Sequence, residues 1–195
     1  MNELMSFALA ALALAGSPGP ATLSLAATGA AFGLRPGLRY MSGIVAGMIA
    51  VIGLVASGIV GLLLLLPAAT TVLALLAGAY FLYLAYVIAT APPLTDNEQQ
   101  RPPRFADGVL LSLVNPKGYA AMAALFSGFA IVGSAPAEVV VKLALLIAII
   151  MAVNIAWLIA GQGLTRFLRD PRTSRLVNLA LAALLIASLA LTFLF

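Results

Sequence analysis

The sequence predicts an all-α integral membrane protein: six transmembrane helices, arranged as two inverted-topology three-helix repeats with a broken first helix in each. Three observations predict it: an apolar composition, six long apolar stretches, and an odd number of these stretches on each side of one polar linker. Of the 195 residues, 64% are hydrophobic and 8% are charged, whereas a soluble domain carries roughly 25% charged residues. So few charges cannot cover a water-soluble surface, which excludes a cytosolic globular enzyme.

The composition also excludes several kinds of functional site. The chain contains no cysteine and no histidine, so it has no disulfide, no Cys/His metal site and no Ser-His or Cys-His nucleophile. We therefore expect no cofactor and no metal. The formal net charge is +4, but the basic residues fall in the loops of a membrane protein. The expected partner is the lipid bilayer, and no nucleic acid.

Six stretches of the chain are long enough to cross a membrane, which takes about 20 largely apolar residues. They are residues 4–31, 38–66, 68–91, 107–132, 137–161 and 176–195. The polar, proline-rich stretch 92–106 lies between the third and the fourth and predicts a cytoplasmic linker. The chain is thus divided into a first three-helix repeat (1–91), the linker (92–106) and a second three-helix repeat (107–195).

The basic residues predict how these spans are oriented. Eight arginines lie in the first, third and fifth loops: Arg35, Arg39, Arg101, Arg104, Arg166, Arg169, Arg172 and Arg175. We assign Lys142 alone to the opposite side, and Lys117 lies inside a span. Because lysine and arginine concentrate in cytoplasmic loops, these three loops are predicted to be cytoplasmic. Both termini are then outside the cytoplasm, in a multi-pass protein of the plasma (inner) membrane.

The first span of each half is interrupted by proline and glycine, at residues 16–20 and at residues 115–118. Proline disfavours helix in the residue before it and is favoured as the first residue of a new helix. Each motif therefore ends one half-helix and begins another within the membrane. Three spans per half insert the second half upside down, and matched breaks in such repeats indicate a midplane binding site of a secondary transporter. The alternative is that the prolines only kink two helices for packing.

The candidate substrate-binding residues lie at these breaks and on the fifth span. The N-terminus of a half-helix offers free N–H groups and a positive dipole end, which together bind anions. Lys117 is an ionisable residue inside a span and so indicates function. It is our candidate for proton coupling; otherwise it is a permanent cation for a substrate carboxylate, or it reaches the inner interface. Asn154 lines the pathway or joins two helices. The predicted set is Ser17, Pro18, Gly19, Pro20, Ala21, Asn115, Pro116, Lys117 and Asn154.

At these motifs the chain resembles the lysine exporter (LysE/RhtB) family of small amino-acid efflux proteins. The resemblance is carried by Pro-Gly-Pro at 18–20, the Gly-Leu-Arg-Pro-Gly turn at 33–37 and Asn-Pro-Lys at 115–117. Length, six spans and the central linker agree as well. The resemblance implies an exporter of amino acids or related small zwitterions, driven by the proton gradient, with 18–20 and 115–117 as signature positions. Ala21 departs from the family pattern, in which a polar residue, often Asn or Asp, follows the Pro-Gly-Pro motif.

The leading hypothesis is therefore an amino-acid exporter whose two repeats alternate access around a midplane site. One alternative is a membrane assembly or scaffold protein that transports nothing. Another is an intramembrane hydrolase with Ser112 or Ser17 as nucleophile and Lys117 as base. Ser112 and Lys117 are five residues apart and do not share a helix face. The sequence leaves open the amino acid, the coupling ion, and the oligomeric state, a homo-oligomer included.

Overall fold

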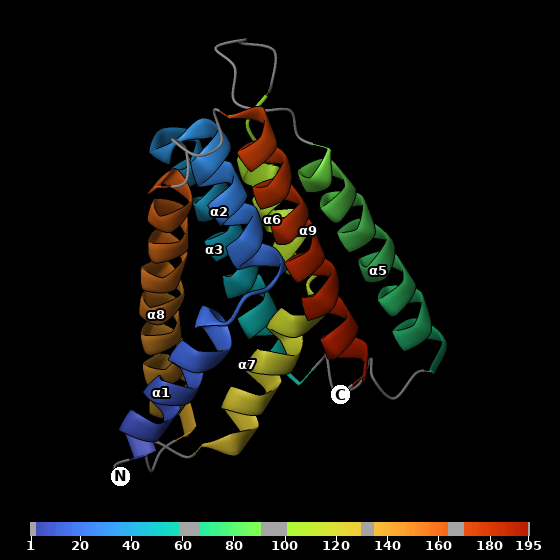
Figure 1. Cartoon of the computed structure of the whole chain (residues 1–195). Helices are drawn as coiled ribbons and strands as arrows, with labels where there is room; N and C mark the ends of the chain where they lie inside the picture. Colours follow the sequence, from blue (N-terminus) through green and yellow to red (C-terminus); the bar gives the residue numbers. More distant parts are fainter. Residues whose placement is uncertain (1–2, 59–66, 91–100, 130–134, 164–169, 195) are drawn as a thin grey trace.

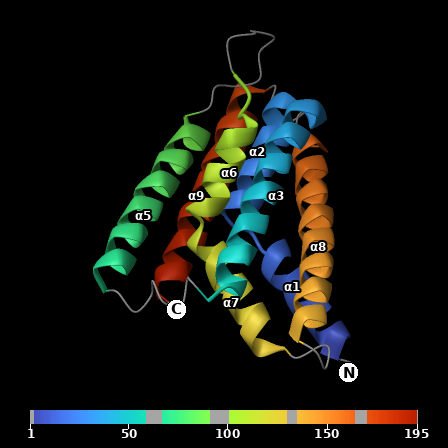
Figure 2. The same cartoon turned by 180° about the vertical axis from the view of Figure 1, so that it is seen from behind.

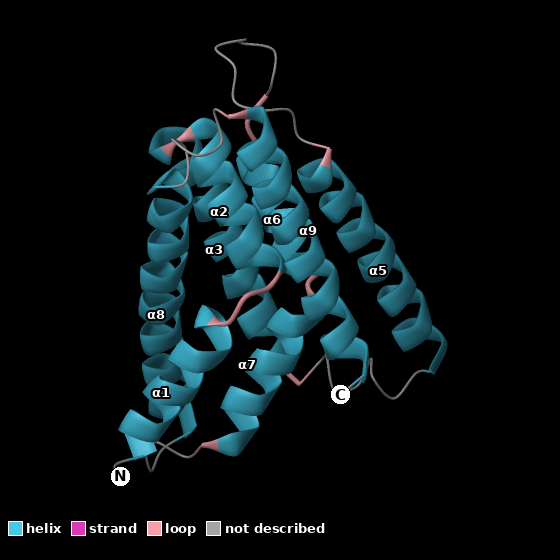
Figure 3. Ribbon diagram, in the orientation of Figure 1, coloured by secondary structure: helices cyan, strands magenta, loops and turns pink. Residues whose placement is uncertain are grey.

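The computed structural model describes residues 3–58, 67–90, 101–129, 135–163 and 170–194. All regular secondary structure in these ranges is helical (Figure 3). The helices are α1 (Glu3–Gly16), α2 (Pro20–Phe32), α3 (Leu34–Ala56), α5 (Pro67–Ala89), α6 (Phe105–Leu113), α7 (Pro116–Gly128), α8 (Ala135–Gly163) and α9 (Pro171–Leu194). They form one elongated bundle; α1 begins and α9 ends at its lower end in Figure 1.

Two of these helices, and two bent helix pairs, could cross a membrane by length and composition. The single helices are α3 and the Ala137–Gly163 part of α8. The pairs are α1 with α2, bent by 58°, and α6 with α7, bent by 62°. In both pairs the break falls where the proline and glycine motifs predict it. The six-span count and the inverted relation of the two halves remain predictions.

The helix boundaries follow from local chemistry. The chain turns from α2 into α3 at Gly33, whose φ of +79° lies in the left-handed region that glycine adopts without strain. At the other end of the sequence, α9 begins at Pro171, five residues before the predicted span. Proline is tolerated at the first helical position. Asp170 precedes it as the N-cap, because its carboxylate accepts hydrogen bonds from the N–H and the hydroxyl of Thr173, both at 2.8 Å.

Helices α3 and α6 lie side by side because glycines let their backbones touch (Figure 2). A Cβ on Gly43 would overlap the carbonyl of Phe105, and a Cβ on Gly108 would overlap the carbonyl of Tyr40. Any larger residue at these positions would push the two helices apart. We call this contact the α3–α6 glycine interface.

Helices α2 and α8 meet in the same manner. A Cβ on Gly161 would overlap the carbonyl of Ala26, and a Cβ on Gly29 would overlap the carbonyl of Leu158. We call this contact the α2–α8 glycine interface. Small residues at such crossings are typical of membrane helices, where close backbone approach replaces the hydrophobic drive available in water. Together the two interfaces hold α2, α3, α6 and α8 at one end of the bundle, the upper end in Figure 1.

Lys142, which we assigned to the side opposite the arginines, falls within the fifth predicted span (137–161) and lies in the third turn of α8. Its side chain is 3% exposed. Its ammonium pairs with Glu138 at 2.7 Å and donates hydrogen bonds to the carbonyls of Phe126 and Phe129, where α7 ends. A cation at the C-terminal end of a helix is stabilised by the dipole and by unpaired carbonyls. The interior of the described bundle therefore contains two lysines, not Lys117 alone.

Candidate functional site

The two helix breaks meet through Lys117, which reaches from the start of α7 to the end of α1. Its ammonium lies 2.8 Å from the hydroxyl oxygen of Ser17, 2.9 Å from the carbonyl oxygen of Ser17 and 3.0 Å from that of Pro18. An ammonium has three protons to donate, and three acceptors surround this one. The signature motif of the second half is thus joined to that of the first half across about 100 residues of sequence.

The ammonium of Lys117 lies beside carbonyl groups, although the residue itself is in the first turn of α7. Its two carbonyl acceptors, Ser17 and Pro18, directly follow the C-terminal end of α1. The last carbonyls of a helix have no partner within it, so the lysine satisfies groups that membrane burial would otherwise leave unpaired. Gly19 leaves space for this side chain, because a Cβ there would lie 2.8 Å from the Lys117 nitrogen.

A second long-range bond binds the end of α1. The indole nitrogen of Trp157 on α8 donates to the carbonyl of Gly16 at 3.2 Å. The start of α2 is closed locally instead: the hydroxyl of Thr22 accepts from the N–H of Gly19 at 2.9 Å and donates to its carbonyl at 3.1 Å. The first break is therefore held by its own threonine, by α7 and by α8.

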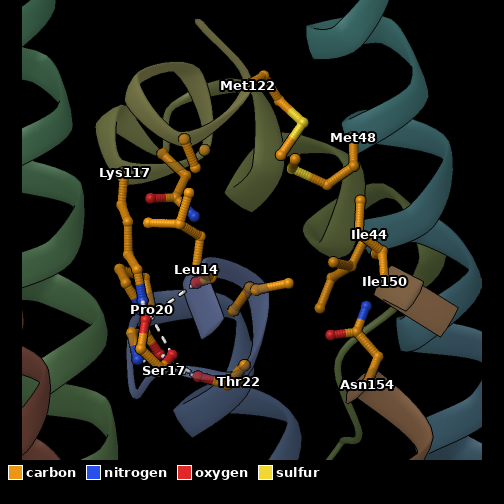
Figure 4. A pocket seen from close by; sticks show the side chains of 16 residues that line it. Leu14, Ser17, Pro20, Thr22, Ile44, Met48, Lys117, Met122, Ile150 and Asn154 are labelled. Atoms are coloured by element: carbon orange, nitrogen blue, oxygen red, sulfur yellow. Dashed lines mark hydrogen bonds between the residues drawn. The ribbon is translucent and has the colours of Figure 1, made fainter. Parts of the chain in front are cut away.

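A cavity lies beside this joint. Its volume is about 60 Å³, which is room for a few water molecules. Figure 4 shows Lys117 extended toward Ser17 and Pro20, and Asn154 on the opposite side of the cavity. Of the predicted site residues, the structure brings these to the cavity: Ser17, Gly19, Pro20, Ala21, Asn115, Lys117 and Asn154. Pro18 and Pro116 do not line it; Pro18 supplies an acceptor to Lys117, and Pro116 is the first residue of α7.

The apolar walls of the cavity were not predicted. They include Ile44 and Met48 from α3, Met122 from α7 and Ile150 from α8. In the sequence these residues lie in apolar stretches where every residue is a candidate for lipid or for core. Only the packing of helices that are far apart in sequence shows which of them face the cavity.

Two asparagines at the cavity have unpaired polar atoms. Asn115 is 5% exposed and Asn154 is 4% exposed. Among the described residues, the side-chain oxygen of Asn115 and the side-chain nitrogen of Asn154 have no hydrogen-bond partner. A buried polar group without a partner costs roughly 1–3 kcal/mol. Such groups at the wall of a cavity are suited to a polar ligand.

The geometry does not fit the hydrolase alternative. Ser112 donates to the carbonyl of Ile44 at 2.8 Å, within the α3–α6 glycine interface. Ser17 does lie at Lys117, but its hydroxyl donates to the carbonyl of Leu14 at 2.9 Å while the lysine donates to the serine. A nucleophilic serine needs the opposite direction, with the base accepting its proton. Among the described residues, no group of three or more acidic, histidine or cysteine side chains could hold a metal ion.

Comparison with known proteins gives one family. The family model described as LysE type translocator matches residues 12–195, which include both breaks. Cysteine/O-acetylserine efflux proteins of Escherichia coli (strain K12) and Shigella flexneri serotype 5b (strain 8401) are each 30% identical to the chain over 184 residues. Each alignment covers 94% of this chain and 93% of the relative. No solved structure matches significantly.

Proposed function

Because the chain belongs to the LysE family of translocators, we propose that it exports small amino acids or related zwitterions through the site at its two helix breaks. A translocator moves its substrate across a membrane and is not an enzyme. The observation that carries the proposal is the joint at Lys117, which brings the two signature motifs together beside a cavity with unpaired polar groups. Discontinuous helices that meet in this way are the usual substrate sites of secondary transporters.

The proposed substrates follow from the relatives and from the cavity. The similar proteins are named for the efflux of cysteine and O-acetylserine, and both compounds are small zwitterions with an uncharged side chain. Ala21 lines the cavity at the start of α2. Its methyl group adds no charge at the position where the family usually has a polar residue. We propose substrates of the same class for this chain.

We propose the six-span architecture with its inverted repeats as the frame of this transport. Each half presents a bent pair followed by a long single helix: α1–α2 with α3, and α6–α7 with α8, with bends of 58° and 62°. Residues 1–91 and 107–195 would rock against each other around the site to alternate access, and residues 92–106 would link them. The arginine distribution supports an inner-membrane protein with both termini outside the cytoplasm.

We propose that transport is proton-coupled, with Lys117 as the proton carrier. A neutral amine has two protons to donate instead of three, so deprotonation would break at least one bond to Ser17 or Pro18 and loosen the joint between the halves. Protonation of Lys117 and the relative position of the repeats would then be linked. In many transporters a buried carboxylate carries the coupled proton instead.

The test is the flux of labelled amino acids in proteoliposomes, with and without a pH gradient. We expect uphill movement in the wild type. Lys117→Arg keeps a cation that cannot lose its proton. This variant should still exchange substrate across the membrane but fail to concentrate it when a pH difference is imposed. Uphill transport by the Arg variant would assign coupling to another group. A wild type that moves no amino acid under any gradient would refute the proposed function itself.

A further inference from the structure

We propose that Asn115 and Asn154 bind the two charged ends of the substrate. The oxygen of Asn115 would accept from the ammonium group, and the amide nitrogen of Asn154 would donate to the carboxylate. The apolar wall would then take a short, uncharged side chain. This inference rests on the proposed transport function and specifies its substrate class: neutral zwitterions are bound, whereas basic and acidic amino acids are rejected.

Asn115 occupies a position whose side chain normally forms a hydrogen bond with the backbone. It is the N-cap of α7, and an N-cap asparagine usually accepts a hydrogen bond from an N–H of the first helical turn. Here the side chain makes no such bond, and its buried oxygen has no partner in the described structure. An oxygen of this kind can only accept. The charged donor of an amino acid is its ammonium group, which fits this oxygen, although the oxygen lies at the positive end of α7.

Asn154 supplies the opposite chemistry from the other side of the cavity (Figure 4). Its unpaired atom is the amide nitrogen, which can only donate. Trp157 lies three residues further along α8 on the same face, and its bond to Gly16 turns this face toward the first break. Pro20 and Ala21, at the start of α2, line the same cavity. A buried amide nitrogen without a partner fits the acceptor end of an amino acid, which is its carboxylate.

The charge inventory of the cavity limits what else can bind. Lys117 is the only charged side chain among the residues that line it in the described structure, and its three protons are directed at Ser17 and Pro18. A second positive or negative charge on the substrate would therefore be buried without a partner, which is strongly unfavourable. The methionines Met48 and Met122 give an adaptable apolar wall, which suits thiol, thioether and small ester side chains alike.

Equilibrium binding of ³⁵S-labelled L-cysteine to the purified protein, under reducing conditions, tests the inference. The chain has no cysteine, so the probe cannot form a disulfide with it. Cysteamine lacks the carboxylate and 3-mercaptopropionate lacks the amine. Because each leaves one buried asparagine unpaired, we expect each to compete about tenfold to a hundredfold less well than cysteine. L-Lysine and L-glutamate should not compete measurably.

The variants assign each end of the substrate to one residue. Asn154→Leu should weaken cysteine binding at least tenfold but leave cysteamine unchanged, since cysteamine has no carboxylate to lose. Asn115→Leu should weaken cysteine and spare 3-mercaptopropionate, whereas Asn115→Asp keeps an acceptor and should retain cysteine. Asn178→Leu is the matched control, because Asn178 is a buried asparagine of α9 that does not line the cavity.

The results separate this inference from the transport function. Equal losses of cysteine and cysteamine in Asn154→Leu would show that Asn154 only packs, and competition by lysine or glutamate as strong as that of cysteine would refute the substrate class. A wild type that binds no cysteine also overturns the inference. If proteoliposomes of that protein export a charged amino acid, the proposed transport function stands and only the inference about the two asparagines fails. If they export no amino acid, the proposed function and the inference both fail.

Discussion

The two ends of the bundle are held together by different kinds of contact. At the α2/α6 end, backbone touches backbone through Gly43, Gly108, Gly29 and Gly161. At the α1/α7 end the contacts are between side chains: the rings of Phe7 and Phe129 meet edge to face with centroids 5.6 Å apart, and the Lys142 ammonium binds the end of α7. A Cβ built on Gly16, Gly53 or Gly128 at this end would meet no described atom within 4 Å, and one built on Gly118 of α7 would meet the side chain of Met48, not a backbone.

This difference indicates which end can open. Where helices touch at glycine backbones, a change of side-chain rotamer does not separate them, so the whole helices must move. Contacts between aromatic rings and a long lysine side chain can be broken by rotamer changes alone. If the two repeats alternate access as proposed, we expect the α1/α7 end to open before the α2/α6 end. The cavity between them is lined by residues of α1, α2, α3, α7 and α8, and by none of α6.

The largest effect is expected from Lys142, the charged contact of the α1/α7 end. Lys142→Met removes the ion pair with Glu138, whose side chain is 18% exposed, and removes the donor for two carbonyls. A buried acceptor that loses its donor costs roughly 1–3 kcal/mol, and two acceptors are affected here, so the variant should melt well below the wild type in detergent. The double variant Lys142→Met/Glu138→Leu removes both charges and should recover part of this loss. If Lys142→Met alone melts like the wild type, the contact does not hold this end.

Replacing single glycines by alanine tests the same comparison between the two ends, and we expect a smaller effect on stability than at Lys142. Gly161→Ala places a methyl group on the carbonyl of Ala26, and overpacking of this kind costs about 1–3 kcal/mol. The control is Gly53→Ala at the α1/α7 end, where a Cβ meets no described atom within 4 Å. Alanine is about 1 kcal/mol better than glycine inside a helix, so this variant should melt slightly higher. Equal melting shifts of the two variants, measured by fluorescence-detected size exclusion, would mean that the two ends do not differ.

The sequence predicted the breaks because proline and glycine determine the local backbone wherever the chain goes. It also predicted Asn115, Lys117 and Asn154 as residues of interest, since polar groups are rare in spans. It could not show that Lys117 binds the end of α1, because that contact depends on how two half-helices about 100 residues apart pack. The role of Lys142 could not be predicted for a related reason. Hydropathy does not reveal that this lysine, one turn after Glu138, pairs with it and enters the bundle.

The smallest effect is expected at Asp170, which caps α9 at the α2/α6 end. The N–H and the hydroxyl of Thr173 bind its carboxylate and lower the pKa of Asp170 below its ordinary value of 3.8. A lowered pKa stabilises the folded protein above the ordinary value, and this contribution is lost as the pH falls through the lowered pKa. Asp170 is fully exposed, so the contribution is small.

Asp170→Asn keeps the capping oxygen and cannot titrate, so it serves as the control. As the pH falls from 7 to 3, the melting temperature should fall slightly more in the wild type than in the Asn variant. An equal fall in both proteins would show that the cap does not contribute to the pH dependence of stability. Because the glycine contacts carry no charge, we expect no further acid dependence from the α3–α6 and α2–α8 glycine interfaces.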